Sequence, residues 1–213
     1  MGKSSTKPKG ATSYKDTAFG IIPRSKLVKL EIEGTKKGLE YIEDLLRKQK
    51  NTKITLDLIL DLHRVSFGWI FPKWAGKLRT VQVTFSGKEA LPFYQLSELI
   101  INLCRDSEEI MSRLSNPAKE NFILEVVSLL AWFQHKFVFI HPFQDYNGRI
   151  ARMLTILILL RLGLPPIEVK SERKSDRKSY LTAMQKADGG DLSLLEKLIS
   201  QALNESLGSI KKL

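Results

Sequence analysis

Residues 147–162 constrain the fold most strongly, because apolar side chains lie on nearly every side of the helix that they would form. The apolar members are Ile150, Met153, Leu154 and the run Ile156–Leu160. A helix without a polar face has to be surrounded by other elements, so the pattern predicts the central helix of a bundle. Gly163-Leu164-Pro165-Pro166 follows and predicts where that helix ends.

A second apolar helix is predicted directly upstream, and the rest of the chain also favours helices. Residues 117–139 are rich in Leu, Val, Phe and Trp, and Pro142 cannot continue that helix. Between residues 79 and 93, Val81, Val83 and Phe85 alternate with polar residues before Ser86-Gly87, which predicts a short β-hairpin. The expected fold is all-α, a helical bundle with one small hairpin. The other expected helices cover residues 36–49, 55–67, 94–114, 175–187 and 191–206.

The short turn between the two apolar helices contains side chains that can accept a proton, bind a cation or bind phosphate. It contains His141, Asp145, Asn147, Gly148, Arg149 and Arg152. The N-terminus of a helix offers unpaired N–H groups and the positive end of a dipole, which together bind phosphate. Arginines three residues apart share one helix face and can hold the same anion. The turn therefore predicts a nucleotide-triphosphate site.

Each of these residues also has a plainer interpretation. Asp145 or Asn147 could be only an N-cap, worth about 1 kcal/mol. The two arginines could pair with structural carboxylates, and His141 could be a hydrogen-bonded turn histidine. The functional interpretation is favoured because all of these residues lie in one turn.

Composition predicts one ordinary domain. The 213 residues are 43% hydrophobic and 27% charged, which is typical of a globular chain and enough for one core. We expect a flexible basic tail over residues 1–25 and a single domain over 26–213. One cysteine, Cys104, allows no internal disulfide and fits a cytoplasmic compartment. Since no apolar run approaches about 20 residues, we expect no membrane span.

The formal net charge of +11 is the main argument for a different class of function. Basic chains attract nucleic acid, but here the lysines and arginines are scattered and accompany no recognisable DNA-reading module. We therefore do not expect nucleic-acid binding. The same charge could guide an acidic protein or ATP to the chain.

The turn resembles the signature of the Fic family, HPFxDGNGRxxR, and matches it at every defined position except one. His141-Pro142-Phe143-Gln144-Asp145-Tyr146-Asn147-Gly148-Arg149 carries the likeness and Arg152 completes it. Flanking segments are similar in the right order: Ala75–Arg79, Leu91–Phe93 and Arg177–Tyr180. The resemblance covers about residues 26–206. It implies a Fic-type helical bundle with a hairpin flap, and transfer of AMP from ATP to a protein hydroxyl.

The resemblance also implies a role for each residue of the signature. His141 would be the general base that takes the proton of a Ser, Thr or Tyr hydroxyl on the target. Asp145 would hold Mg²⁺, a cation that prefers carboxylate oxygen. Asn147 and the amides around Gly148 would bind phosphate. Arg149 and Arg152 would hold the β- and γ-phosphates of ATP.

The hairpin and possible partners follow from the same resemblance. Gln82, Val83 and Thr84 would belong to the flap that binds an extended target segment by strand addition. A plain surface hairpin is the alternative. A toxin-like chain of this kind could have an antitoxin partner or associate with itself, and the sequence leaves both open.

Tyr146 is the one departure, because the family has mostly Gly at this position. If the position needs positive φ or touches phosphate, a tyrosine costs free energy or narrows the site. The ring could instead project outward toward the target or the base, and we favour this second interpretation because Asn147-Gly148-Arg149 is intact.

Glu33-Gly34 resembles part of the family's inhibitory motif, [S/T]xxxE[G/N]. The resemblance implies that Glu33 pairs with Arg152 and blocks the γ-phosphate. Lys29 stands where the motif has Ser or Thr. The alternative is that Glu33-Gly34 only leads into the helix 36–49, with Thr35 as its N-cap.

Three functions remain open at this point. The first is a Mg²⁺-dependent protein adenylyltransferase. The second keeps the fold with another nucleotide or phosphate-containing donor, or removes AMP from proteins. The third is a nucleotide- or protein-binding module in which Tyr146 has weakened catalysis.

Overall fold

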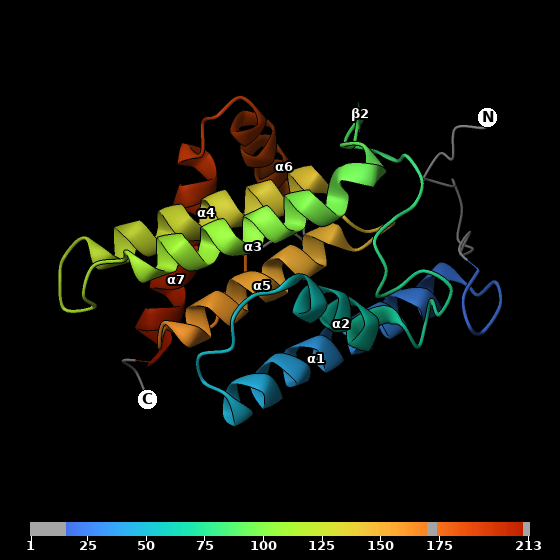
Figure 1. Ribbon diagram of the computed structural model, residues 1–213, viewed down its shortest axis with the longest axis horizontal. Helices are drawn as coiled ribbons and strands as arrows, with labels where there is room; N and C mark the ends of the chain where they lie inside the picture. Colours follow the sequence, from blue (N-terminus) through green and yellow to red (C-terminus); the bar gives the residue numbers. More distant parts are fainter. Residues whose placement is uncertain (1–15, 170–173, 211–213) are drawn as a thin grey trace. The chain divides into compact units, whose positions relative to one another are not determined.

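The computed structural model describes residues 16–169 and 174–210, and these residues are mostly helical (Figure 1). The expected all-α class with a small hairpin is confirmed. The described chain has seven α-helices, a two-stranded antiparallel sheet and one 3₁₀ turn: α1 (Arg24–Lys48), α2 (Leu56–Phe67), β1 (Thr84–Phe85), β2 (Lys88–Glu89), η1 (Phe93–Gln95), α3 (Leu96–Ser112), α4 (Phe122–Ile140), α5 (Asn147–Arg161), α6 (Lys174–Asp188) and α7 (Ser193–Ile210).

α1 begins at Arg24, well before the expected start at residue 36. Thr35 is therefore inside the helix and not its N-cap, and its hydroxyl donates to the Glu31 carbonyl at 2.9 Å. Glycine usually disfavours a helix interior, which is why Gly34 looked like a boundary in the sequence. In the structure Gly34 is buried where α1 crosses α2 (Figure 1).

Residues 16–25 of the expected flexible tail are among the described residues. Residues 1–15 of that tail lie outside the described residues. The Ala18 amide donates to the Ile70 carbonyl at 2.8 Å, and Ile22 is buried. The 16–23 segment therefore packs onto the loop that follows α2.

The chain divides into two compact units. The first contains the described residues up to Asn102 together with Ile140–Ile150, and the second contains Leu103–Phe139 and the described residues from Ala151 onward. α3, α4 and α5 each contribute residues to both units. The expected single domain over 26–213 stays a prediction.

The core of the first unit is aromatic where α2 meets the turn before α5. Phe67 and Phe71 are fully buried, and the ring of Tyr146 stacks on Phe67 with centroids 4.1 Å apart. α1 reaches this cluster because it lacks side chains at Gly34 and Gly38, which are both buried.

α4 is the buried centre of the second unit. Gln134 Nε2 donates to the Tyr180 hydroxyl of α6 at 3.0 Å, and Thr155 of α5 donates to Gln134 Oε1 at 3.2 Å. Contrary to the sequence expectation, α4 is long and apolar enough to span a membrane by its 19 residues and composition. However, 56% of the apolar window is buried inside the structure, as in the core helix of a bundle.

Gly34→Ala tests the contact between α1 and α2. An added Cβ would lie 2.3 Å from the Ser66 carbonyl oxygen, so the helices would have to separate. We expect the free energy of unfolding in urea to fall by about 2–4 kcal/mol.

Gly208→Ala is the matched control, because Gly208 lies inside α7 with nothing within 4 Å of its added Cβ. This change should raise the free energy of unfolding by about 0.5–1 kcal/mol. Equal effects of the two changes would contradict the close approach of α1 to α2.

Candidate active site

The turn before α5 is held in shape by the side chain of Asn147. Asn147 Oδ1 accepts from the Phe143 amide at 2.9 Å, and Asn147 Nδ2 donates to the Phe143 carbonyl at 2.8 Å. Asn147 is only 2% exposed. Its side chain therefore braces the loop, while the predicted contact of Asn147 with phosphate stays a prediction.

Phe143 and His63 anchor the same turn in the core. The two rings stack with centroids 3.8 Å apart, and both residues are fully buried. His63 Nδ1 accepts from the Gly76 amide at 2.8 Å, so Nε2 carries the proton and lies 3.3 Å from the Asp145 carbonyl. Burial lowers the pKa of His63 to about 3, so the ring is neutral. These contacts give His63 a structural role in holding the turn.

His141 lies at the start of the turn, beside the hairpin. Its backbone has a φ of +54°, and its carbonyl accepts from Arg79 Nε at 2.7 Å. The imidazole stacks on the Phe85 ring of β1 with centroids 4.0 Å apart and an angle of 11°. The structure thus places His141 next to the hairpin that was predicted to bind a target segment.

Tyr146 does not project outward, so the favoured interpretation of its ring was wrong. The residue has a φ of +62° and is 7% exposed, and its ring also stacks against Trp74. The position does require the left-handed conformation that glycine adopts at little cost. Stacking and a hydrogen bond offset that cost, since the hydroxyl donates to Glu31 Oε1 at 2.7 Å. Burial, then the Glu31 carboxylate, raise the pKa of Tyr146.

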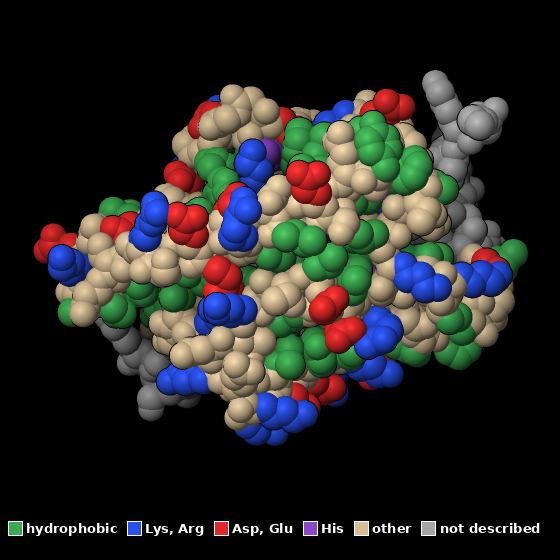
Figure 2. Space-filling model, viewed as in Figure 1, with side chains coloured by type: hydrophobic (Ala, Val, Ile, Leu, Met, Phe, Trp, Pro, Cys, Tyr) green, Lys and Arg blue, Asp and Glu red, His purple; other side chains and the backbone are tan. Residues whose placement is uncertain are grey.

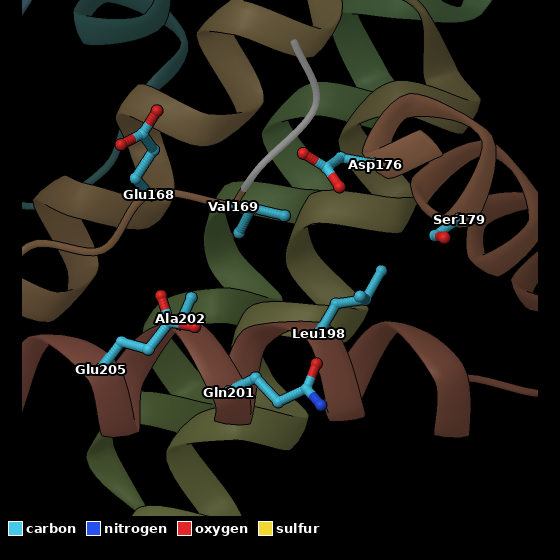
Figure 3. Close-up of a pocket in the computed structure, with 8 residues that line it drawn as sticks. All are labelled: Glu168, Val169, Asp176, Ser179, Leu198, Gln201, Ala202 and Glu205. Atoms are coloured by element: carbon cyan, nitrogen blue, oxygen red, sulfur yellow. The ribbon is translucent and has the colours of Figure 1, made fainter. Parts of the chain in front are cut away.

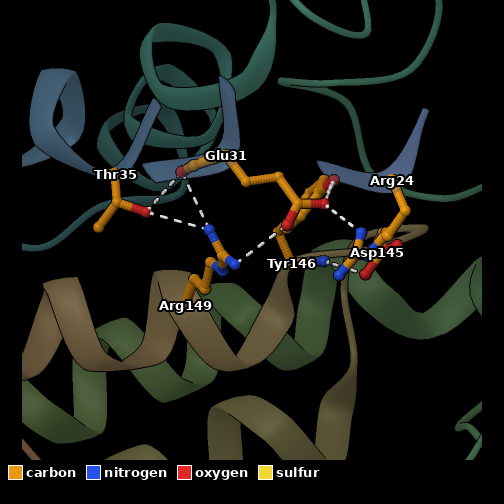
Figure 4. A network of polar contacts seen from close by, with 6 residues as sticks. All are labelled: Arg24, Glu31, Thr35, Asp145, Tyr146 and Arg149. Carbon is orange, nitrogen blue, oxygen red and sulfur yellow. Dashed lines mark hydrogen bonds and ion pairs between the residues drawn. The ribbon is translucent and has the colours of Figure 1, made fainter. Parts of the chain in front are cut away.

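Glu31 is the centre of a buried polar cluster that sequence reasoning missed (Figure 4). Its carboxylate accepts from Arg24 at 3.1 Å and from Arg149 Nη2 at 3.1 Å, in addition to the tyrosine hydroxyl. Arg149 Nη1 also donates to the Glu31 carbonyl at 2.9 Å. The Arg149 guanidinium is therefore bound to α1, and its predicted role as a phosphate ligand requires these contacts to open.

The carboxylate that approaches Arg149 is that of Glu31 and not that of Glu33. Glu33 lies two residues further along α1, where its side chain is exposed. Arg152 is in the second unit, where burial raises the pKa of the Tyr180 hydroxyl and the positive charge of Arg152 acts in the opposite direction. The predicted pair of Glu33 with Arg152 stays a prediction.

Asp145 lies just before α5 and Gly148 lies in its first turn, and their predicted roles in binding Mg²⁺ and phosphate stay predictions. Asp145 is partly exposed, and its Oδ1 accepts from the Tyr146 amide at 2.6 Å. Gly148 lies in the first turn of α5, whose N-terminal amides precede the apolar part of the helix. Among the residues that the structure describes, no group of three or more His, Cys, Asp or Glu side chains could hold a metal.

The hairpin is shorter than the expected span of residues 79–93. Thr84 pairs with Glu89, Phe85 pairs with Lys88, and both turn residues, Ser86 and Gly87, have positive φ. Of the predicted flap residues, Gln82 and Thr84 are exposed and Val83 is half-buried. Gln82 is also tied to the hairpin, because its amide donates to the Ala90 carbonyl.

A pocket in the second unit does not suit a nucleotide (Figure 3). It is lined by α6, α7 and the segment before α6, and three of its side chains, Glu168, Asp176 and Glu205, are acidic. Three carboxylates would repel a triphosphate. The candidate active site is therefore the turn before α5.

Two of the missed residues left weak signals in the sequence. Glu31 lies in the first part of α1, before residue 36, and the sequence did not predict that part as helix. Arg79 follows the turn at Gly76. The contacts that join them to the turn and to α5, from Arg79 to His141 and from Glu31 to Arg149, span 62 and 118 residues, so neither contact could be found from local spacing.

Comparison with known proteins relates this site to one family. The model of the Fic/DOC family matches residues 53–159. The chain is 29% identical over 194 residues to the protein adenylyltransferase Fic of Nematostella vectensis, covering 90% of this chain and 42% of that protein. It is 28% identical over 179 residues to the protein adenylyltransferase fic-1 of Caenorhabditis elegans, covering 83% and 32%. The chain thus spans less than half the length of these curated relatives.

Solved structures show the same fold. Fic-1 of C. elegans has a TM-score of 0.68 and 26% identity, covering 85% of this chain and 52% of that chain. The BepC protein of Bartonella tribocorum, solved with bound AMPPNP, has a TM-score of 0.64 and covers 92% and 94%. Its identity of 18% makes that likeness one of fold alone.

The buried His63 predicts a loss of stability in acid. Because the pKa of the folded state, about 3, lies below the ordinary value of 6.5, only the unfolded chain binds this proton between those values. Stability from the neutral ring is complete above pH 6.5 and is lost as the pH falls toward 3. The expected slope is at most about 1.4 kcal/mol per pH unit, measured by urea unfolding from pH 7 to 4.

His63→Gln should flatten that slope, because glutamine does not titrate. His135→Gln, a histidine change in the second unit, leaves His63 in place, so the part of the slope that His63 supplies should remain. The interpretation fails if wild type and His63→Gln lose stability in parallel.

Proposed function

The chain belongs to the Fic/DOC family, and we propose that it is a protein adenylyltransferase that moves AMP from ATP to a hydroxyl side chain of a target protein. The observation that carries the proposal is the position of His141, between the hairpin and the turn that leads into the N-terminus of α5. The proposed base, the helix terminus proposed to bind phosphate and the hairpin proposed to dock a target all lie in one compact unit. The curated relatives named above carry this activity in their names.

In the proposed reaction, His141 takes the proton of the target hydroxyl. The hydroxyl oxygen forms a bond to the α-phosphorus of ATP. The bond between that phosphorus and the oxygen that bridges the α- and β-phosphates breaks, and pyrophosphate leaves. A histidine suits this step because its ordinary pKa, about 6.5, leaves it largely neutral at physiological pH. Positioning and charge neutralisation supply most of the rate, as in other phosphate chemistry.

We propose that the first turn of α5 binds the phosphates through its unpaired amides, with Gly148 allowing close approach. The donor set fits a magnesium ion, since one partly exposed carboxylate, Asp145, would be completed by phosphate oxygens and water. When bound, Mg²⁺ neutralises phosphate charge. Asp145 would hold it, and the backbone of Asp145 is itself fixed by His63.

Arg149 and Arg152 would complete the phosphate contacts, because they lie three residues apart on α5. For Arg149 this means exchanging the carboxylate of Glu31 for a phosphate. Such an exchange gives Arg149 a new charge-assisted partner, while the Glu31 carboxylate keeps the hydrogen bonds from Arg24 and the Tyr146 hydroxyl.

The hairpin would dock an extended target segment by strand addition. The exposed positions Gln82 and Thr84, with Val83 between them, present the edge that such a segment would meet. The acceptor would be a Ser, Thr or Tyr hydroxyl brought to the His141 imidazole.

Location and further partners are proposals of the same kind. A cytoplasmic compartment fits a chain with one buried cysteine, Cys104. An antitoxin or a second copy of the chain could restrain a toxin-like activity. On the face shown in Figure 2, lysine and arginine side chains are scattered among acidic ones, which fits our expectation that nucleic acid is not a partner.

The test of the function is transfer of label from [α-³²P]ATP to protein in the presence of Mg²⁺. We expect His141→Ala to lower the rate of self-modification by about 10²–10⁴-fold, because proton removal by a general base is worth about that much.

His135→Ala, a histidine change outside the turn, is the matched control and should keep transfer. Circular dichroism verifies that both variants fold. Nucleotide binding without transfer in wild type would favour the binding-module alternative, and label from another nucleotide would favour a different donor.

Regulation by Glu33 is tested separately. If the exposed Glu33 carboxylate restrains Arg152, Glu33→Ala raises the rate of self-modification by about tenfold or more, in the range of typical coupling energies. The control is Glu40→Ala, which removes another exposed carboxylate of α1. Equal rates in the two variants would remove Glu33 from the regulation.

A further inference from the structure

Arg79 is a buried guanidinium that joins both ends of the hairpin to the turn that carries His141. It is 4% exposed. Its Nε donates to the His141 carbonyl at 2.7 Å, its Nη1 donates to the Val81 carbonyl at 3.0 Å, and its Nη2 donates to the Leu91 carbonyl. One side chain therefore contacts the segment that enters the hairpin, the segment that leaves it and the turn that carries His141.

The backbone of Arg79 makes a fourth contact with the same turn. The Arg79 amide donates to the Pro142 carbonyl at 2.9 Å. Successive carbonyls, those of His141 and Pro142, are thus both bound to Arg79. His141 has a φ of +54°, a backbone conformation that costs a non-glycine residue free energy and persists only where its surroundings fix it. The two hydrogen bonds to Arg79 hold the backbone in that conformation.

The hairpin contacts the imidazole directly through Phe85. The ring of Phe85 lies parallel to that of His141, with centroids 4.0 Å apart. On the hairpin, Phe85 pairs with Lys88, whose ammonium group lies 5.0 Å from the centre of the Phe85 ring. Phe85 therefore covers one face of the imidazole and restricts rotation of that ring.

We propose that Arg79 and Phe85 are positioning residues for the base, so that the hairpin sets the orientation of the His141 imidazole. The proposal rests on the proposed function and deepens it. Neither side chain has to touch ATP or the reacting atoms. Arg79 fixes the backbone of the base, and Phe85 fixes its ring.

The choice of arginine supports a positioning role over simple packing. Arg79 is 4% exposed, so its charge is partly removed from water, and this burial lowers the pKa of the guanidinium. An apolar side chain could fill the space without that cost. Only a planar group with donors in several directions reaches three carbonyls on three segments.

The arrangement also connects docking to chemistry. A target segment that adds to the hairpin becomes fixed relative to Phe85, and through Arg79 relative to His141. The distance between the docked hydroxyl and the base is then set by one rigid part of the chain. Misplacement by about 1 Å can cost about 10²-fold in rate, so this rigidity should appear in the turnover rate and not in nucleotide binding.

The first experiment needs no nucleotide. NMR spectra of wild type, Arg79→Met, Arg79→Lys and Phe85→Leu report the His141 ring protons and the exchange of the hairpin amides. Phe85→Leu should move the His141 ring resonances downfield, because the stacked aromatic ring is gone. Arg79→Met should move them in the same direction and speed amide exchange across residues 83–90, and Arg79→Lys should restore part of both.

The controls remove an exposed side chain of the same type. Arg47→Met breaks an exposed pair with Asp44 on α1, and Phe19→Leu changes an exposed ring of the first unit. Both should leave the His141 resonances unchanged. If Arg79→Met fails to fold, Arg79→Lys and Phe85→Leu carry the test. Unmoved His141 resonances in these variants would overturn the proposal.

The second experiment measures self-modification with labelled ATP. Arg79→Met, or Arg79→Lys if only that variant folds, and Phe85→Leu should lower the maximal rate by about ten- to hundredfold while the KM for ATP changes by less than about twofold. A wild-type rate in a variant whose His141 resonances have moved would overturn the proposal. Absence of transfer in wild type would instead remove the proposed function, and the NMR experiment would still decide whether the hairpin orients His141.

Discussion

The buried carboxylate of Glu31 is the interaction on which the candidate site depends. A buried charge is costly unless it is paired and hydrogen-bonded, and Glu31 meets that requirement with Arg24, Arg149 and the Tyr146 hydroxyl. These contacts join α1 to the turn and to the first turn of α5. Loss of any partner would leave a buried charge incompletely compensated, so the position of Arg149 and the shape of the turn are set together.

The same cluster explains how the chain tolerates a tyrosine where its family has mostly glycine. The left-handed backbone at Tyr146 costs about 1–3 kcal/mol for a residue with a side chain. Stacking on Phe67 and the hydrogen bond to Glu31 act in the opposite direction. The substitution moves the ring into the core, away from the surface that a target would meet, and it leaves the amides of α5 in place.

Two sets of contacts fix the turn, one at its start and one at its end. Glu31 and Tyr146 fix its end, where the amides proposed to bind phosphate begin, and Arg79 and Phe85 fix its start, where the proposed base, His141, lies. Between them, His63 and Asn147 bond to the backbone and keep the loop from collapsing. The turn is short, but most of the bonds that hold it come from elements far away in the sequence.

The sequence alone determined the helical class, the hairpin and the turn with His141 and Asp145, because periodicity, turn residues and the spacing of a motif are local. Only the tertiary structure decided the start of α1, the direction of the Tyr146 ring and the partner of Arg149. Gly34 looks like a break until α2 is seen against it, and Glu31 looks like a surface residue until two guanidiniums approach it. Burial and long-range pairing change the free energy of such residues, and neither is encoded in the residues beside them.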